Sequence, residues 1–411
     1  MLDINLIRRS PETIKDVIEK RNGDPSLVDK FLTIDADWRK IKAETDELRA
    51  KQKTFGEAER EKAKELKEQI QLREEKISIM EKERLYLLEH MPNLIAPDVP
   101  IGKSEEDNAV LREVGARPKF DFEPKDYLTL VNGLINTERA GRVAGSRFGY
   151  IFGDLVRMEF ALIRLGFDIF LARGFIPVLP PVMVKAEIMK GMGKIKFIED
   201  DDAFYLPADD LYLAGTSEHT IIPFHTEQTL DEADLPRRYV GFSTCFRREA
   251  GSYGKDMKGI LRGHQFDKME LNSLVKPEDS EKEHLFLLSL QEELMQKLEL
   301  PYRVMSISTG DMGFSDYKQY DIEAWMPSQG KYRETHSCSN TTDYQSRGLS
   351  IKYRKASGEA DYLHTLNATG ITFRAVIAII ENNQTSQGKI MAPKVLRDYL
   401  GKDEIEVRDI R

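Results

Sequence analysis

Apolar and polar positions follow a helical period through the first quarter of the chain. Residues 26–90 contain no proline, and their apolar side chains recur every three or four positions. The pattern breaks near residues 53–57, where Gly56, the only glycine of the stretch, permits the chain to reverse. The pattern predicts two helices of about 30 residues, each roughly 45 Å long, folded as an antiparallel hairpin. Both are too polar to be buried all round, so we expect a projecting arm, and a dimerisation arm is an equally good interpretation.

The segments on either side of this hairpin differ from it. Residues 1–24 predict a short helix that Pro11 opens and Asn22-Gly23 ends. Residues 91–108 hold three prolines and a polar end, which is typical of a linker. Beyond them, helical segments alternate with β-rich runs and turn clusters rather than with regular βαβ units. We therefore expect two domains, residues 1–108 and 109–411, and an antiparallel α+β fold for the second.

Composition narrows the class of protein. The net charge of -9 argues against nucleic-acid binding by charge alone, although a local basic stripe is compatible with it. The two cysteines, Cys245 and Cys338, lie far apart and indicate neither a disulfide framework nor a zinc site. No apolar run is long enough to span a membrane, and the N-terminus lacks the features of a secretory signal. A reducing cytoplasm is the expected location.

The stretch 237–271 is the richest in candidate chemistry. It predicts a strand ending at Arg247, a loop, and a return strand from Gly263 to Leu271. The loop carries three glycines, Gly251, Gly254 and Gly259. An arginine can bind phosphate with two hydrogen bonds, and an aromatic ring such as Phe266 can stack on adenine. A salt-bridged hairpin with a core phenylalanine is the simpler interpretation of these residues taken alone.

Three further stretches carry weaker signals. Residues 216–218 offer two hydroxyls and a carboxylate, and they also fit a helix N-cap. Glu334 and Ser337 could hold a hard cation such as Mg²⁺, or simply form the polar face of an edge strand. Arg374 begins an apolar helix, where the helix dipole is unfavourable for a cation. A bound anion or a salt bridge would explain that arginine. No Walker A loop or GxGxxG turn is present.

Taken together, these stretches resemble the seryl-tRNA synthetases of class II, over essentially the whole chain. The most specific matches are residues 245–270, 309–327 and 336–340. The resemblance implies an antiparallel class II synthetase sheet of six to seven strands flanked by helices. It also implies that residues 26–90 form a coiled-coil arm for tRNA, and that residues 174–184 support a homodimer interface.

The same resemblance implies roles for individual residues. Arg247 and Arg374 would be the catalytic cations on the triphosphate. The implied ATP site comprises Arg247, Arg248, Glu249, Gly263, Phe266, Glu334, Thr335, His336, Ser337 and Arg374. The implied serine site comprises Thr216, Ser217, Glu218, Arg247, Glu270, Asn367 and Thr369. Mg²⁺ would bind with ATP at Glu334 and Ser337, and no zinc is expected.

The expected reaction is the ATP-dependent activation of L-serine to seryl-adenylate, followed by transfer of serine to tRNA-Ser. The sequence leaves open whether tRNA-Sec is also a substrate. Departures from the family pattern lie at His219, at His336, and between Asn367 and Arg374, a segment that is one residue short and carries Thr369 in place of serine. We interpret both histidines as structural side chains.

Two other readings compete with this one. Relatives that load a carrier protein with an amino acid lack the long arm, whereas this chain keeps residues 26–90. A non-catalytic scaffold would be expected to lose the ATP arginines, whereas Arg247 and Arg374 are both present.

Overall fold

The computed structural model describes residues 1–55, 59–250 and 259–407. The chain forms two compact units, residues 1–94 and 95–411. The expected linker is therefore mostly part of the second unit. Ala96 donates its backbone N–H to the carbonyl of Tyr317 over 3.0 Å and packs in a small apolar cluster with Met305 and Met312.

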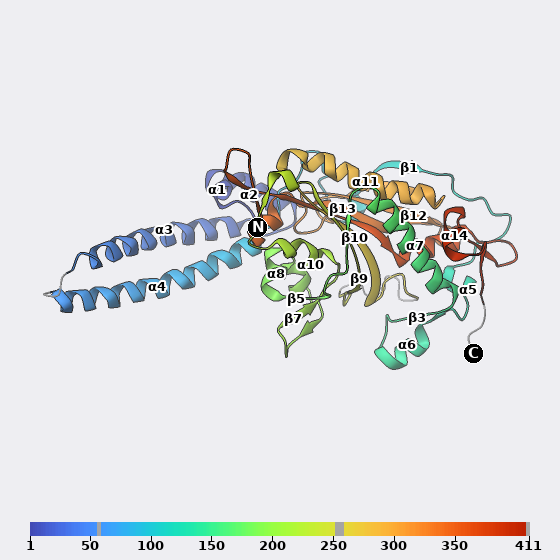
Figure 1. The fold of residues 1–411 in the computed structure, drawn as a ribbon, viewed down its shortest axis with the longest axis horizontal. Coiled ribbons are helices and arrows are strands. Elements are labelled where there is room, and N and C mark those ends of the chain that lie inside the picture. Colours follow the sequence, from blue (N-terminus) through green and yellow to red (C-terminus); the bar gives the residue numbers. More distant parts are fainter. Residues whose placement is uncertain (56–58, 251–258, 408–411) are drawn as a thin grey trace. The chain divides into compact units, whose positions relative to one another are not determined.

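The first unit is helical, and the predicted hairpin is confirmed. Its helices are α1 (Ile4–Arg9), α2 (Pro11–Lys20), α3 (Ser26–Gln52) and α4 (Arg60–Glu89). Figure 1 shows α3 and α4 side by side along their length. Trp38 donates to Glu81 over 3.2 Å and Arg49 to Glu74 over 2.6 Å, so the two helices run antiparallel. The expected turn residue Gly56 lies outside the described residues. The sequence predicted α2 but not the separate α1.

A buried carboxylate fixes the base of this hairpin. Asp35 on α3 is fully buried and accepts hydrogen bonds from Arg8 of α1 over 2.8 Å and from Arg84 of α4 over 2.6 Å. Burial would raise the pKa of Asp35, but the two guanidinium groups hold it below its usual value. The guanidinium of Arg84 also lies 4.0 Å from the ring centroid of Trp38. Three helices are thus joined at one ionic group.

An eight-stranded sheet forms the centre of the second unit. Its strand order is β1-β11-β12-β13-β16-β10-β9-β4, and every pairing is antiparallel except that of β4 with β9. The predicted antiparallel sheet is confirmed, with more strands than expected because short edge strands extend it. The strands are β1 (Ala109–Val114), β4 (Ile176–Val178), β9 (Arg237–Phe246), β10 (Gln265–Val275), β11 (Tyr302–Ser306), β12 (Lys318–Met326), β13 (Lys331–Asn340) and β16 (His364–Thr372).

Three helices pack against this sheet: α7 (Asp154–Leu171), α11 (Ser280–Lys297) and α13 (Phe373–Asn382). Figure 1 labels α7 and α11 beside it. Their apolar side chains and those of the strands form one continuous core. Gly166 of α7 permits close packing, because a Cβ there would lie 2.6 Å from Ile371 Cδ1.

Shorter elements surround the sheet. The helices are α5 (Tyr127–Leu130), α6 (Thr137–Ala144), α8 (Ala186–Gly191), α9 (Ile195–Glu199), α10 (Glu218–Ile221), α12 (Tyr344–Leu349) and α14 (Arg397–Leu400). The small strands are β2 (Ile135–Asn136), β3 (Tyr150–Ile151), β5 (Met183–Lys185), β6 (Tyr205–Leu206), β7 (Leu211–Leu213), β8 (Thr229–Asp231), β14 (Lys352–Arg354), β15 (Ala360–Tyr362), β17 (Ile390–Met391) and β18 (Glu404–Ile405).

Two sequence expectations about environment can be compared with the fold. Within the described part of the chain, no helix has both the length and the apolar character that crossing a bilayer requires. Cys245 and Cys338 are both free and buried, as expected for a protein without a disulfide framework.

The Asp35→Ala variant should destabilise the first unit by about 3 kcal/mol, because it leaves the buried guanidinium of Arg84 without its carboxylate. Urea unfolding followed by Trp38 fluorescence and helical circular dichroism measures this loss. Asp46→Ala is the control, since Asp46 forms an exposed pair with Arg49 and should cost less than about 1 kcal/mol. Equal losses in the two variants would contradict the assigned role of Asp35.

Candidate active site

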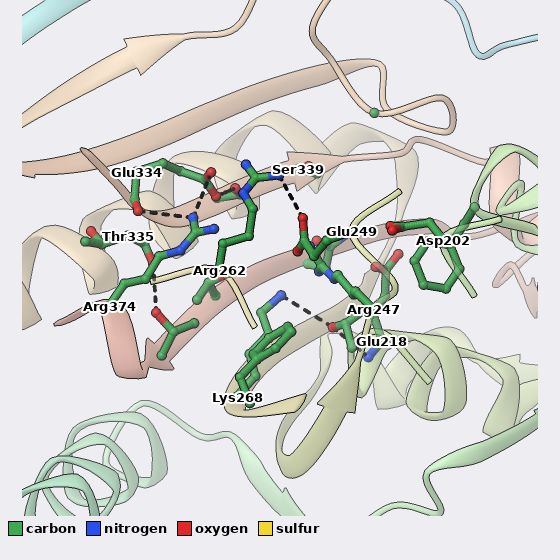
Figure 2. A pocket seen from close by; sticks show the side chains of 18 of the residues that line it. Asp202, Glu218, Arg247, Glu249, Arg262, Lys268, Glu334, Thr335, Ser339 and Arg374 are labelled. Carbon is green, nitrogen blue, oxygen red and sulfur yellow. Dashed lines mark hydrogen bonds and ion pairs between the residues drawn. The ribbon is translucent and has the colours of Figure 1, made fainter. Parts of the chain in front are cut away.

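A cavity of about 380 Å³ lies against the sheet of the second unit. Its walls come from the ends of β9 and β10, from β13, from the junction of β16 with α13, and from α9 and α10. Figure 2 shows the charged side chains that project into it. Those that line it include Lys194, Glu218, Arg247, Glu249, Arg262, Lys268, Glu334 and Arg374.

Arg247 enters the cavity from the end of β9. Antiparallel pairing sets Cys245 opposite Phe266 on β10, which brings the arginine beside that phenylalanine. The Nε of Arg247 donates to the carbonyl of Gly215 over 3.1 Å, and its guanidinium lies 5.5 Å from the ring centroid of Phe266. The side chain is half-buried and held by the backbone of another segment, as a preorganised anion-binding group would be.

Arg374 reaches the same cavity from the first turn of α13. Its Nε donates to the carbonyl of Leu261 over 3.2 Å, and its Nη1 lies 3.0 Å from a carboxylate oxygen of Glu334. Desolvation of the carboxylate by the surrounding protein would raise the pKa of Glu334, but Arg374 and Arg247 lower it to about 2. This carboxylate is therefore ionised at neutral pH. It offsets a cation that the helix dipole alone would disfavour.

A second ion pair borders the cavity beyond Arg247. Glu249 accepts from Arg262 over 2.7 Å and has a φ of 54°, a left-handed conformation that is uncommon for glutamate. Arg147 donates to the backbone carbonyl of Glu249 over 3.0 Å. Two of the loop glycines singled out in the sequence, Gly251 and Gly254, lie outside the described residues.

Two buried ion pairs form one end of the cavity. Lys194 lies 3.1 Å from Glu218, and Gln345 donates to the same carboxylate over 2.7 Å. Burial would raise the pKa of Glu218, but Lys194 and the other groups around it lower it to about 2. Lys268 lies 2.6 Å from Glu270, whose pKa burial raises despite this lysine. This end of the cavity therefore offers matched charges for a small zwitterion.

Both unusual histidines are neutral. His219 accepts from the backbone N–H of Gly215 over 3.3 Å, and burial lowers its pKa to about 3. His336 lies 2.8 Å from the hydroxyl of Thr335, and burial lowers its pKa to about 4. His219 borders the cavity, whereas His336 does not line it. These environments fit the structural roles expected for both side chains.

Most of the residues expected at the site line this one cavity. They are Thr216, Glu218, Arg247, Glu249, Gly263, Phe266, Glu334, Thr335, Ser337, Asn367, Thr369 and Arg374. Ser217, Arg248, Glu270 and His336 do not line it. Arg248 turns away because its Nε donates to Ala203 and its guanidinium lies 4.8 Å from the ring centroid of Phe204. Glu270 lies behind Lys268.

Several charged groups of the cavity were absent from the residues expected there. Lys268 shares a strand face with Phe266, so the alternation of β10 could have identified it. Arg262 lies three residues before the first residue of β10 and became significant only through its pairing with Glu249. Lys194 precedes α9, and no local sequence pattern connects it with Glu218.

Comparison with known proteins shows which family the chain belongs to. Residues 1–95 match the model of the seryl-tRNA synthetase N-terminal domain. Residues 204–383 match the class II tRNA synthetase core domain of the G, H, P, S and T enzymes. A serine–tRNA ligase of Thermobifida fusca is 41% identical, over 98% of this chain and 98% of the relative. The chain belongs to the seryl-tRNA synthetase family. The family named from the sequence motifs is therefore confirmed.

Solved seryl-tRNA synthetases share the fold as well. The structure from Pyrococcus horikoshii, complexed with ATP, has a TM-score of 0.92 and 39% identity, over 98% of this chain and 99% of the other. The cytoplasmic enzyme of Naegleria fowleri, in complex with AMP, has a TM-score of 0.88 and 35% identity, over 99% of both chains.

The Glu218–Lys194 pair predicts a specific pH dependence of stability. The folded-state pKa of Glu218 is about 2, below the ordinary value of about 4.5, so the pair stabilises the protein above about pH 4.5. That contribution is lost as the pH falls towards 2. Wild type should therefore exceed Glu218→Gln in Tm at neutral pH, and the difference should shrink as the pH falls below about 4.5.

Thermal melts of both proteins from neutral to acidic pH measure this difference. Glu199→Gln serves as the matched control, because Glu199 and Lys196 are 3.5 Å apart at the surface and should give a small difference at every pH. A gap for Glu218→Gln that is constant down to pH 3 would contradict the low pKa.

Proposed function

We propose that this chain is a serine–tRNA ligase that activates L-serine with ATP and transfers the seryl group to tRNA-Ser. The observation that carries the proposal is the convergence of Arg247 and Arg374, from separate elements, on one cavity with a buried ionic pocket alongside. The two solved relatives are complexes with ATP and AMP, which supports nucleotide binding by this chain.

Activation requires an in-line displacement at the α-phosphorus. A carboxylate oxygen of serine forms the new O–P bond, and the bond to pyrophosphate breaks. Negative charge grows on the phosphoryl oxygens and on the leaving pyrophosphate, where Arg247 and Arg374 can stabilise it. No protein base is needed, because the serine carboxylate is already ionised at neutral pH. The ring of Phe266 provides a surface on which adenine can stack.

The ionic end of the cavity suits serine. We assign the ammonium to Glu218, whose carboxylate lines the cavity, and the hydroxyl to Thr216, which lies 3.4 Å from Lys268. Asn367 and Thr369 line the same cavity. Alanine would leave the hydroxyl partner buried without its hydrogen bond, and this loss would favour serine.

Mg²⁺ is the metal that we propose to accompany ATP. Ser337 donates to Glu334 over 3.3 Å, and the nearby Asp321 is buried with a raised pKa, caused by burial and by Glu334. Among the described residues no group of three or more histidine, cysteine or acidic side chains could hold a metal. This oxygen set fits Mg²⁺, which typically takes one or two carboxylates plus substrate phosphates. When bound, the ion would neutralise charge on the phosphates.

The arm formed by α3 and α4 is the proposed tRNA-binding element. Helical RNA is recognised largely by shape and backbone contacts, so a nearly neutral arm can serve. Charging of tRNA-Sec remains an extension of the same proposal.

A homodimer and a cytoplasmic location complete the proposal. In the segment 174–184, Ile176 and Leu179 are exposed, at 44% and 82%, and Phe160 of α7 is exposed at 61%. Exposed apolar side chains of this size are what an interface would cover. The two buried thiols fit a reducing compartment.

Serine-dependent exchange of pyrophosphate into ATP tests the activation step, with alanine and threonine as control substrates. Arg247→Ala should lower the exchange rate by about a thousandfold, because it removes a cation from the transition state. Arg248→Ala is the matched control and should retain exchange within about tenfold, since its side chain lies outside the cavity. Equal losses would contradict the assignment. Exchange with another amino acid would indicate a different substrate, and no exchange in wild type would favour the scaffold reading.

A shortened arm separates activation from tRNA charging. Trp38 pairs with Glu81, so positions 42 and 77 are expected to face one another across the hairpin. Replacing residues 43–76 by a short glycine-serine turn should keep serine-dependent exchange near the wild-type rate and lower aminoacylation of tRNA-Ser at least a hundredfold. Normal charging by this variant would show that the arm has another role.

A further inference from the structure

The second unit contains another cavity, of about 360 Å³, beside the ATP cavity. Of the residues assigned above to ATP or serine, only Gly263 and Phe266 line it. One wall is the segment from α6 to β3, and the others come from α7, from β10 and from the start of α13. On β10 the side chains of Gln265 and Asp267 alternate with Phe266, so they occupy the other face of the strand.

Several aromatic side chains line this cavity. Phe148 and Tyr150 contribute rings from the segment between α6 and β3, and Phe266 and Phe373 contribute rings from β10 and α13. Aromatic faces attract cations through their quadrupole, and flat apolar groups pack well against them. The volume suits a small organic molecule and is far larger than a single water requires.

Two carboxylates supply the polar part of the cavity. Glu159 projects from α7 and is half-buried, and Asp267 accepts a hydrogen bond from Thr244 over 2.6 Å. Burial and the charge of Asp267 raise the pKa of Glu159 to about 7. The empty cavity therefore disfavours the ionised form of Glu159, which a cationic ligand bound beside it would stabilise.

Among the described residues, no cationic side chain is paired with these two carboxylates. Within the described ranges, no lysine or arginine forms an ion pair with Glu159 or Asp267. Of the lysines and arginines that the structure describes, only Arg147 lines the cavity, and its Nη1 donates to the backbone carbonyl of Glu249 over 3.0 Å.

We propose that this cavity binds a small organic cation, a primary ammonium on a flat apolar body, with Glu159 as its counterion. The aromatic walls take the apolar body, and the carboxylate takes the ammonium. A bare metal ion would leave the aromatic walls unused and find few oxygen ligands. Because Gly263 and Phe266 line both cavities, an occupant would contact the far side of residues that border the ATP cavity.

Isothermal titration calorimetry with tryptamine tests the site on the full-length protein. Tryptophol, of nearly the same size with a hydroxyl in place of the ammonium, is the matched neutral probe. Tryptamine should bind with one-to-one stoichiometry and at least tenfold more tightly than tryptophol. No tryptamine binding up to about 5 mM, or equal affinities for the two probes, would overturn the proposal.

Two variants locate the binding. Glu159→Gln should weaken tryptamine at least tenfold and leave tryptophol unchanged. Asp168→Asn changes the same charge on the same helix, where Asp168 accepts from Tyr399, and should leave tryptamine binding at the wild-type value. Equal tryptamine affinity in wild type and Glu159→Gln would overturn the assignment of the counterion.

The pH dependence in the wild-type protein gives an independent measurement, which does not rely on a folded variant. The titratable and charged groups that face Glu159 are Asp267 from β10, and Arg147 and Tyr150 from the segment between α6 and β3; α13 contributes Phe373. Tryptamine stays protonated across this range, so its binding should strengthen severalfold from about pH 6 to about pH 8 as Glu159 ionises. Binding that is constant or weaker at the higher pH would overturn the proposal.

Discussion

The catalytic cavity depends on two guanidinium groups that are held in place by backbone carbonyl oxygens. Arg247 and Arg374 each donate Nε to a carbonyl, of Gly215 and Leu261, in segments far from their own in sequence. Two like charges on one small cavity repel one another, and Glu334 reduces this cost. The electrostatic energy of the two arginines is therefore unfavourable in the empty cavity and becomes favourable when an anion binds between them. Positioning and charge stabilisation are also the main contributions that phosphoryl transfer requires from a protein.

Strand pairing in the sheet brings residues that are distant in sequence together at this cavity. Antiparallel pairing of β9 with β10 brings Arg247 beside Phe266, and the turn from β16 into α13 sets Arg374 opposite them. The buried pairs Lys194–Glu218 and Lys268–Glu270 likewise fix charged side chains at the end of the cavity proposed to bind serine. Each pair offsets its own burial only while both partners are present. Glu218 therefore stays ionised at neutral pH in the folded protein without a bound substrate.

Periodic patterns made most of the fold predictable. The helical period of apolar residues in a polar stretch predicted the hairpin, and the apolar run after Arg374 predicted α13, because both depend on local spacing. The parallel pairing of β4 with β9 and the packing of residues 95–108 on the second unit were not predicted, since both depend on contacts between distant segments.

Sequence motifs identified many of the residues that line the site. The prediction missed residues whose importance comes from an ion pair with a distant part of the chain. Lys194 has no sequence signal, since its importance comes from Glu218, a partner fixed by tertiary structure. Arg248 is the opposite case: it follows Arg247 directly, yet it lies against Phe204 because the chain leaves the strand at this point.

The most direct measurement of the central claim is a crystal structure of this protein with ATP bound. The account predicts the nucleotide in the cavity beside β13, with Arg247 hydrogen-bonded to the α-phosphate and Arg374 to the γ-phosphate. A triphosphate bound elsewhere, or bound here with both arginines directed away from it, would contradict the account.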